Sequence, residues 1–388
     1  MSPRNVLISG GGVAGPTLAY WLARHGFKPT VVERSQGLRS SGNPVDVRGP
    51  ALPVAEGMGI MSRLRDLATQ TTAMRVVDAS GRQVARVAMP ATRSAAGNQE
   101  VEIPRGDLAA ALYESARDEA EFLFDDTIVT MRQDEHGVDV TFDHAAPRRF
   151  DLVVGADGLH STVRRLAFGP EAGFVSHMGV YVATIPLDGP LDGPLDGPLD
   201  GPVDHPHDVL MFNTPGRLVS VHPSRGRAVA AFIFRSSAIA GFDHRDTEQH
   251  RRIVTAAYAD AGWRVPELLA RLAKTEDLYF DSVSQVRLPT WARGRVALLG
   301  DAASCVSLFG DGSSLAMAGA HTLAEALAAT AGHAEAFRRY ETEHRTLVGP
   351  KQRRIGRAKA LLIPRTRWGI AARNLSARVL LKRSGSGG

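Results

Sequence analysis

Cysteine is almost absent from this chain of 388 residues, which contains only Cys305. A single thiol excludes an intrachain disulfide, and without a cysteine cluster we expect no metal site. Long apolar runs are missing as well. No stretch approaches the roughly twenty apolar residues that a membrane-spanning helix needs, and the first residues lack the apolar core of a secretory signal. We therefore expect a cytoplasmic protein with no membrane span.

Acidic residues are absent from residues 345–388, which contain twelve Lys or Arg. Residues 1–344 carry 34 Lys or Arg against 41 Asp or Glu, a net charge of −7. Apolar residues recur through the basic tail at helical spacing and predict a C-terminal helix lying across the acidic body. Weak peripheral contact with an anionic membrane surface is the alternative for this helix, and no basic module of the nucleic-acid-binding kind is visible.

The N-terminal residues combine a short apolar strand, a glycine-rich turn and a helix. The strand VLI (6–8) leads into G-x-G-x-x-G, the helix TLAYWLARHG follows, and a second strand, TVVE, ends in an acid. The first glycine makes a tight turn, the second admits a pyrophosphate and the third packs helix on strand. The motif predicts binding of FAD or NAD by Gly10, Gly12, Val13, Ala14 and Gly15, with Glu33 and Arg34 near the adenosine ribose.

Two further motifs follow the same strand-to-turn pattern. In DLVVGADGLHSTVRRLAFG (151–169) an apolar strand ends before Asp157 and Gly158. In RVALLGDAASCVSLFGDGSSLAMAGA (295–320) a strand ends before Asp301, and a second glycine cluster opens a helix. Acids and glycines at strand ends are suited to binding an extended dinucleotide. The candidate cofactor-binding residues of this last segment are Asp301, Gly310, Gly312, Ser313 and Ser314.

The three motifs, in this order, resemble those of the group A flavoprotein monooxygenases, the para-hydroxybenzoate hydroxylase family. The order of elements looks most like the tetracycline-modifying and polyketide-tailoring members. The resemblance implies one FAD, with NADPH or NADH as transient reductant. It also implies that one oxygen atom of O₂ enters an aromatic or polyketide-like small molecule through a flavin C4a-hydroperoxide.

The resemblance also implies roles for particular residues. Asp301 would meet the ribityl or pyrophosphate part of FAD, and Arg105, in IPRGDLAAAL (103–112), would face the cofactor. The helix that begins near Gly312 would direct its positive end at the flavin ring. No catalytic residue is assigned, and the candidates for contact with the reacting ring are Asp46 and Arg48 in NPVDVRG (43–49), together with His222 and Arg225. Ser304 replaces the histidine of many members, and residues 302–320 contain no proline.

We expect an α/β fold in which a Rossmann-like FAD-binding domain is interrupted by an antiparallel-sheet substrate domain and followed by a long C-terminal helix. Alternating apolar segments predict sheet strands at 180–187, 209–213, 217–223, 228–235 and 281–287, a hairpin at 74–78 and 83–89, and a helical stretch at 246–273. The LDGP repeats (187–202) predict a surface loop. The expected divisions are 1–73, 101–172 and 288–344 for the FAD-binding domain, 74–100 and 173–287 for the substrate domain, and 345–388 for the basic helix.

Other functions remain possible from the sequence. A hydrolase of the nucleophile-elbow type would need G-x-S-x-G, which does not occur. A flavin-dependent reductase of the geranylgeranyl-reductase type shares the first and third motifs and is the main alternative. A flavin-binding sequestration protein without turnover is a third possibility. The sequence does not encode the substrate.

Overall fold

In the computed structural model, the described residues are 4–38, 42–88, 100–187, 207–223, 228–305 and 311–384, without the side chains of 354–358 and 377–384. Residues 188–206, with nearly all of the LDGP repeats, lie outside this range, as do Arg225 and Gly310. Within it, no helix is long and apolar enough to cross a membrane.

A six-stranded sheet contains the predicted nucleotide-binding strands. Its order is β17-β18-β11-β1-β2-β7, and all neighbours pair in parallel except β17 with β18. The central strands are buried on both faces because helices cover them, which explains their continuous apolar runs. The strands are β1 (Asn5–Ser9), β2 (Lys28–Glu33), β7 (Glu121–Phe124), β11 (Leu152–Gly155), β17 (Ala292–Arg293) and β18 (Val296–Leu298).

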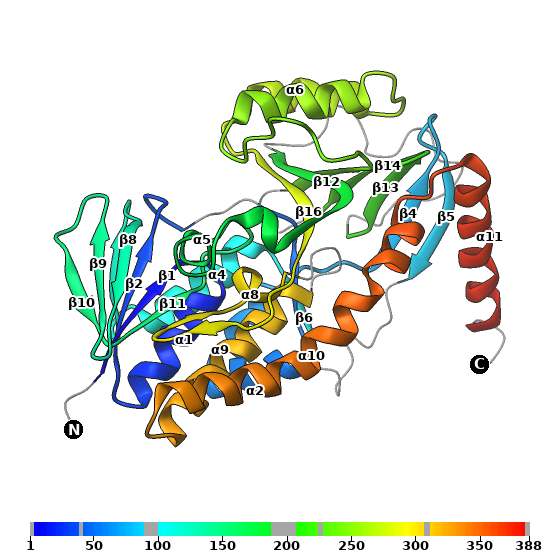
Figure 1. Cartoon of the computed structure of the whole chain (residues 1–388). Helices are drawn as coiled ribbons and strands as arrows, with labels where there is room; N and C mark the ends of the chain where they lie inside the picture. The colour runs from blue at the N-terminus through cyan, green and yellow to red at the C-terminus, as the bar shows by residue number, and fades with distance from the viewer. Residues whose placement is uncertain are drawn as a thin grey trace.

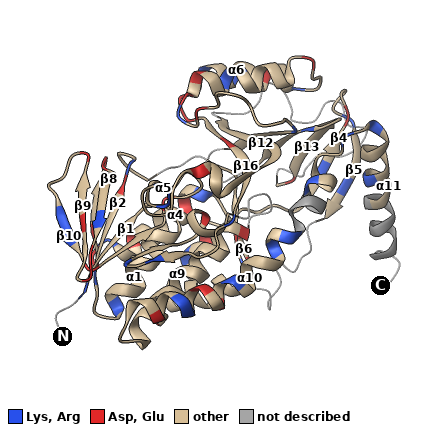
Figure 2. Ribbon diagram, viewed as in Figure 1, with Lys and Arg blue, Asp and Glu red and all other residues tan. Residues whose placement is uncertain are grey.

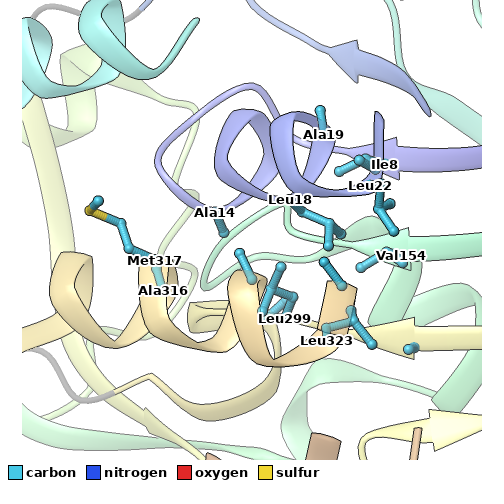
Figure 3. Packing of buried hydrophobic residues seen from close by; sticks show 14 of the residues in the cluster. Ile8, Ala14, Leu18, Ala19, Leu22, Val154, Leu299, Ala316, Met317 and Leu323 are labelled. Carbon is cyan, nitrogen blue, oxygen red and sulfur yellow. The ribbon is translucent and has the colours of Figure 1, made fainter. Parts of the chain in front are cut away.

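Helices α1 (Ala14–Arg24) and α9 (Asp311–Ala329) pack closely beside this sheet. Figure 3 shows Ala14 of α1 facing Ala316 of α9. A Cβ at Gly300 would lie 3.3 Å from the Ala14 Cβ and 3.6 Å from the Ala316 Cβ. Small residues at this crossing therefore let both helices begin next to the end of β18. The neighbouring helices are α2 (Leu52–Gly57), α3 (Met61–Asp66), α4 (Arg105–Ala116), α5 (Thr162–Phe168) and α8 (Asp301–Ser304), with 3-10 turns η1 (Gly49–Ala51) and η3 (Glu171–Gly173).

Two small antiparallel sheets adjoin this layer. One has the order β10-β9-β8 and projects from the edge of the molecule next to β2 and β11 in Figure 1. The other pairs β3 with β6, and places Asp46 opposite Glu102. The strands are β3 (Val45–Val47), β6 (Val101–Ile103), β8 (Ile128–Gln133), β9 (Val138–Phe142) and β10 (Arg148–Phe150).

The alternating segments form a seven-stranded sheet with the order β16-β12-β15-β14-β13-β4-β5. Its pairs are antiparallel except that β13 runs parallel to β4, so the predicted hairpin joins the sheet through β4. The buried Asp208 carboxylate strengthens this junction, since it accepts hydrogen bonds from Thr72 Oγ1 at 2.7 Å and Arg86 Nε at 2.8 Å. The strands are β4 (Ala73–Val77), β5 (Gln83–Ala88), β12 (Val175–Leu187), β13 (Val209–Thr214), β14 (Arg217–His222), β15 (Ala228–Phe234) and β16 (Tyr279–Val286).

Two helices, α6 (Thr247–Tyr258) and α7 (Val265–Lys274), cover one face of this sheet, and Figure 1 shows α6 above it. Tyr258 ties α6 to the sheet because its hydroxyl donates to the carbonyl oxygens of Leu218 and Ile233. The stretch predicted to be helical at 246–273 is thus two helices. Between them Trp263 has a positive φ of 58°, which a continuous helix does not allow.

The predicted single helix over residues 345–388 is two helices in the structure. Helix α10 (His333–Leu362) begins before the basic segment, and α11 (Arg367–Ser384) follows a turn. The break occurs where Ile363 is buried against the seven-stranded sheet and Pro364, whose ring lacks an N–H, cannot continue the helix. In Figure 1, α10 runs along the molecule from the six-stranded sheet toward the seven-stranded sheet, and α11 lies at the margin beside β5.

Candidate active site

The three motif glycines lie in the turn between β1 and α1 and differ in what surrounds them. Gly10 has a φ of 113°, and a Cβ there would lie 2.5 Å from the Ala156 carbonyl oxygen. A Cβ at Gly15 would lie 1.9 Å from the Gly10 oxygen. At Gly12, by contrast, no described atom lies within 4 Å of the Cβ position. Gly10 and Gly15 are therefore required by the fold, and Gly12 leaves its backbone open to a ligand.

The start of α1 has the character of an anion-binding site. Val13 occupies the N-cap position and provides no side-chain hydrogen bond, and Ala14 is the first helical residue. The first N–H groups of a helix have no partner within the helix, and its dipole adds a partial positive charge. Together with the open backbone at Gly12, this geometry suits a pyrophosphate.

Glu33 ends β2 beside this turn. Its carboxylate accepts hydrogen bonds from the backbone N–H groups of Gly11 at 2.7 Å and Ser35 at 2.9 Å. These bonds hold the two loops together and leave lone pairs that can accept from ribose hydroxyls. Arg34 follows at the strand end, where its charge contributes, after burial, His160 and Arg245, to lowering the pKa of His244.

Asp157 is directed into the protein. Its carboxylate accepts hydrogen bonds from Ser161 Oγ, from Val163 N at 3.0 Å and from Ser9 Oγ at 3.3 Å, and burial raises its pKa. It therefore fixes the turn after β11 to β1 and to the start of α5. Gly158 follows with a φ of 79°, which glycine adopts without strain.

Asp301 and the beginning of α9 lie together, as their motif predicts. Asp301 is the first residue of α8, and its Oδ1 lies 3.8 Å from the Cβ position of Gly312. Burial raises the pKa of Asp301, and the nearby charge of Arg105 opposes this rise. The Asp301 carboxylate and a glycine-led helix start thus lie together, where the charge of Arg105 is felt.

The remaining candidates of this region hold α9 against β3. Ser314 Oγ donates to the Asp46 carbonyl oxygen at 2.7 Å, and Ser313 Oγ donates to the same oxygen at 3.2 Å. Arg48 donates from its backbone N–H to Ser314 Oγ and from Nη2 to Asp311 Oδ1 at 2.7 Å. The side chains of Asp46 and Arg48 lie 3.3 Å apart. These four residues are therefore committed to positioning the helix start.

The residues present fit FAD. The open backbone at Gly12, the acid at the end of β2, and the charged side chains of Asp301 and Arg105 are complementary groups for the pyrophosphate, the ribose and the ribityl chain. Asn43 Oδ1, just before β3, is a buried polar atom that has no hydrogen-bond partner among the described residues.

Comparison with known proteins agrees with this geometry. The family model described as "FAD binding domain" matches residues 4–349. The chain belongs to the FAD-binding-domain family of flavin-dependent monooxygenases. An uncharacterized protein of Mycobacterium tuberculosis is 39% identical over 90% of this chain and 92% of its own length. A flavin-dependent monooxygenase of Legionella longbeachae is 33% identical over 90% of this chain and 87% of its own length.

Solved structures extend the similarity to the whole fold. The tetracycline destructase Tet(51) superposes on this flavoprotein with a TM-score of 0.84 and 30% identity, over 98% of this chain and 97% of that one. The HpxO protein of Klebsiella pneumoniae complexed with FAD has a TM-score of 0.71 and 21% identity, over 97% and 94%, and shares the fold. The predicted α/β fold class is confirmed, and FAD is the cofactor of the family.

His222 lies on the face of the seven-stranded sheet opposite α6 and α7. Its ring Nε2 is 3.0 Å from Ser220 Oγ, and burial lowers its pKa. The charge of Glu102, on β6, opposes this shift. Within the described residues its Nδ1 has no hydrogen-bond partner.

The structure also brings together a cluster that the sequence did not predict. His160, within the second motif, lies 3.1 Å from both Glu171 Oε1 and Asp281 Oδ1, and its ring stacks on His244 with centroids 4.0 Å apart. Burial alone would lower the pKa of His160, but the two carboxylates raise it to about 9. Its partners come from β16, η3 and the loop before α6. No spacing in the sequence could relate them.

Proposed function

We propose that this flavoprotein uses NADPH or NADH and O₂ to insert one oxygen atom into an aromatic or polyketide-like small molecule. The observation that carries the proposal is the polar patch formed by Thr184, Ser220 and His222 on the sheet face opposite α6 and α7. FAD, when bound, accepts electrons from the nicotinamide and activates O₂. The protein's part is to hold the substrate ring and to exclude water.

His222 is suited to recognise a phenolic or enolic hydroxyl. Its lowered pKa keeps the imidazole neutral near neutral pH. In the tautomer protonated at Nε2, the ring donates to Ser220 and Nδ1 is left as an acceptor. Such an acceptor fixes the position of a hydroxyl and increases the electron density of the ring that carries it.

The neighbouring strands place two hydroxyl groups on the same face as His222. Ala231 of β15 pairs with Ser220 on one side and with Thr184 of β12 on the other, so only a methyl group lies between the two hydroxyls. Thr184 Oγ1 is buried without a partner in the described part of the chain. Thr184, Ser220 and Ala231 are buried and His222 is half-buried, so a substrate ring would meet this patch at His222. The 30% identity to a tetracycline destructase supports a polycyclic substrate of this kind.

A panel of phenols and polycyclic polyketides tests the proposal with the FAD-loaded protein. We expect one compound class to stimulate NADPH or NADH oxidation and to yield a product heavier by one oxygen atom. His222→Gln should lower kcat/KM by roughly tenfold or more, as expected for loss of an oriented hydrogen bond, with unchanged FAD content. The matched control is His136→Gln, since His136 is exposed near β8.

The same assay distinguishes the alternatives. A substrate that gains hydrogen and no oxygen would identify a reductase. FAD-loaded protein whose nicotinamide oxidation responds to no compound, although it binds them, would indicate sequestration. Either result would contradict the proposed oxygen insertion.

A further inference from the structure

Helix α11 presents its apolar side to solvent. Trp368 is 86% exposed and Leu375 is 62% exposed. With the exposed Ala371 and Ala372 they occupy positions i, i+3, i+4 and i+7, which form one stripe along the helix. We call these four residues the outer stripe. A helix that only completed the fold would turn such a stripe inward.

The opposite side of α11 holds the helix on the protein. Ile370, Arg373 and Asn374 are half-buried there, and the helix packs on β5 and β13. Arg373 Nη2 donates to Asn213 Oδ1, the last but one residue of β13, at 2.9 Å. Because this polar contact fixes the rotation of α11, the outer stripe cannot turn toward the sheet without breaking it.

The charged residues of the segment that carries the outer stripe are all basic. Arg365 and Arg367, both exposed, directly precede Trp368, and the segment 345–388 contains twelve Lys or Arg and no acid. Figure 2 shows basic residues on the described part of α11 and on the adjoining end of α10. Residues 1–344 have a net charge of −7, from 34 basic and 41 acidic residues, so the net positive charge of the chain comes from this segment.

We propose that the outer stripe and its flanking arginines dock on an anionic lipid bilayer. Indole rings favour the boundary between lipid headgroups and acyl chains, and the neighbouring arginines attract anionic headgroups. The stripe is short and half of it is alanine, so docking is shallow, reversible and dependent on lipid charge. A second copy of α11 is a poor occupant because two basic faces repel each other.

Vesicle binding by the full-length, FAD-loaded protein tests this proposal. Vesicles of phosphatidylcholine alone are compared with vesicles that also contain phosphatidylglycerol, by co-sedimentation at low and high salt. We expect binding only to the anionic vesicles and its loss at high salt. Trp368 fluorescence should shift to the blue on binding, since Trp291 is buried and Trp368 is the strongly exposed tryptophan of the described residues.

Two pairs of variants separate docking from general surface effects. Trp368→Ala should weaken vesicle binding by about tenfold, whereas Val129→Ala, which changes an apolar residue 47% exposed on β8, should not. Arg365→Glu with Arg367→Glu should abolish binding. The same charge reversal at Arg338 and Arg339, which are exposed on α10 outside the basic segment, should leave vesicle binding unchanged. FAD content and nicotinamide oxidation report that each variant is folded.

Three outcomes would overturn the proposal. One is equal binding to neutral and anionic vesicles, and another is binding that Trp368→Ala does not weaken. The third is self-association of the protein that Trp368→Ala abolishes, without vesicle binding, which would show that the outer stripe contacts the acidic body of a second copy.

Discussion

Residues of one motif can be required for different physical reasons. In the turn after β1, Gly15 leaves no room for a methyl group because the Gly10 oxygen occupies it, whereas the space beside Gly12 is open. The motif predicts these different roles in general terms. The structure adds the distances in this chain, which show that Gly15 is required by the fold and that the backbone at Gly12 is open.

This difference predicts opposite effects of two alanine substitutions. Gly15→Ala should lower the free energy of unfolding by about 1–3 kcal/mol or more, as overpacking does, and FAD binding should fall with it. Gly12→Ala should change stability by less than about 0.5 kcal/mol but strongly reduce FAD content, because its methyl group would occupy the pyrophosphate position. Urea unfolding of the FAD-free proteins and flavin absorbance measure the two quantities. Normal FAD content in Gly12→Ala would refute this account of the turn.

At the scale of elements, the start of α9 is set by a partly buried ionic contact. Asp311 Oδ1 accepts from Arg48 Nη2 at 2.7 Å and from Lys351 Nζ, on α10, at 2.9 Å. The carboxylate thus joins β3, α9 and α10. Gly312 follows Asp311 directly and lies beside Asp301, so the contact also sets the position of the helix start relative to Asp301.

Asp311→Asn should therefore destabilise the protein and weaken FAD binding together. Removing the charge leaves Arg48 and Lys351 facing each other, and we expect a loss of about 2 kcal/mol, typical of hydrogen bonds to charged groups. Thermal unfolding with and without FAD gives both effects. Asp134→Asn is the control, because Asp134 forms an exposed ion pair with Arg149 on the small β-sheet and should barely matter. An equal change in both variants would contradict the prediction.

The elements predicted correctly were those with a strong local pattern. Period-two alternation located β13, β14 and β15 almost to the residue, and the three strand-to-turn motifs located the ends of β1, β11 and β18. The small sheet β8–β10 was not predicted, since β8 is largely exposed and does not alternate. The prediction of a single C-terminal helix was wrong because apolar residues keep their helical spacing on both sides of the turn at Pro364. The partners of His160 could not be predicted, since Asp281 is far away in the chain and meets it only through folding.

At the scale of the whole molecule, His160 connects the two large sheets. It belongs to the turn after β11, and its ring nitrogens face Glu171 of η3 and Asp281 of β16, while its ring stacks on His244. Doubly protonated, it donates to both carboxylates. Because its pKa is about 9 here, against 6.5 ordinarily, the folded protein binds the proton more tightly than the unfolded chain. The contact between the sheets is therefore linked to pH.

The sign of this linkage gives the last prediction. The stabilising effect is fully present below pH 6.5 and is lost as pH rises through 9, with a total of up to about 3 kcal/mol from a shift of this size. At acid pH, protonation of Glu171 and of His244, whose pKa values are both lowered, works in the opposite direction. His160→Gln should flatten the stability profile between pH 6.5 and 9, measured by urea unfolding, while His136→Gln should retain the slope. An unchanged slope in His160→Gln would mean that the sheets are held together by contacts that do not titrate.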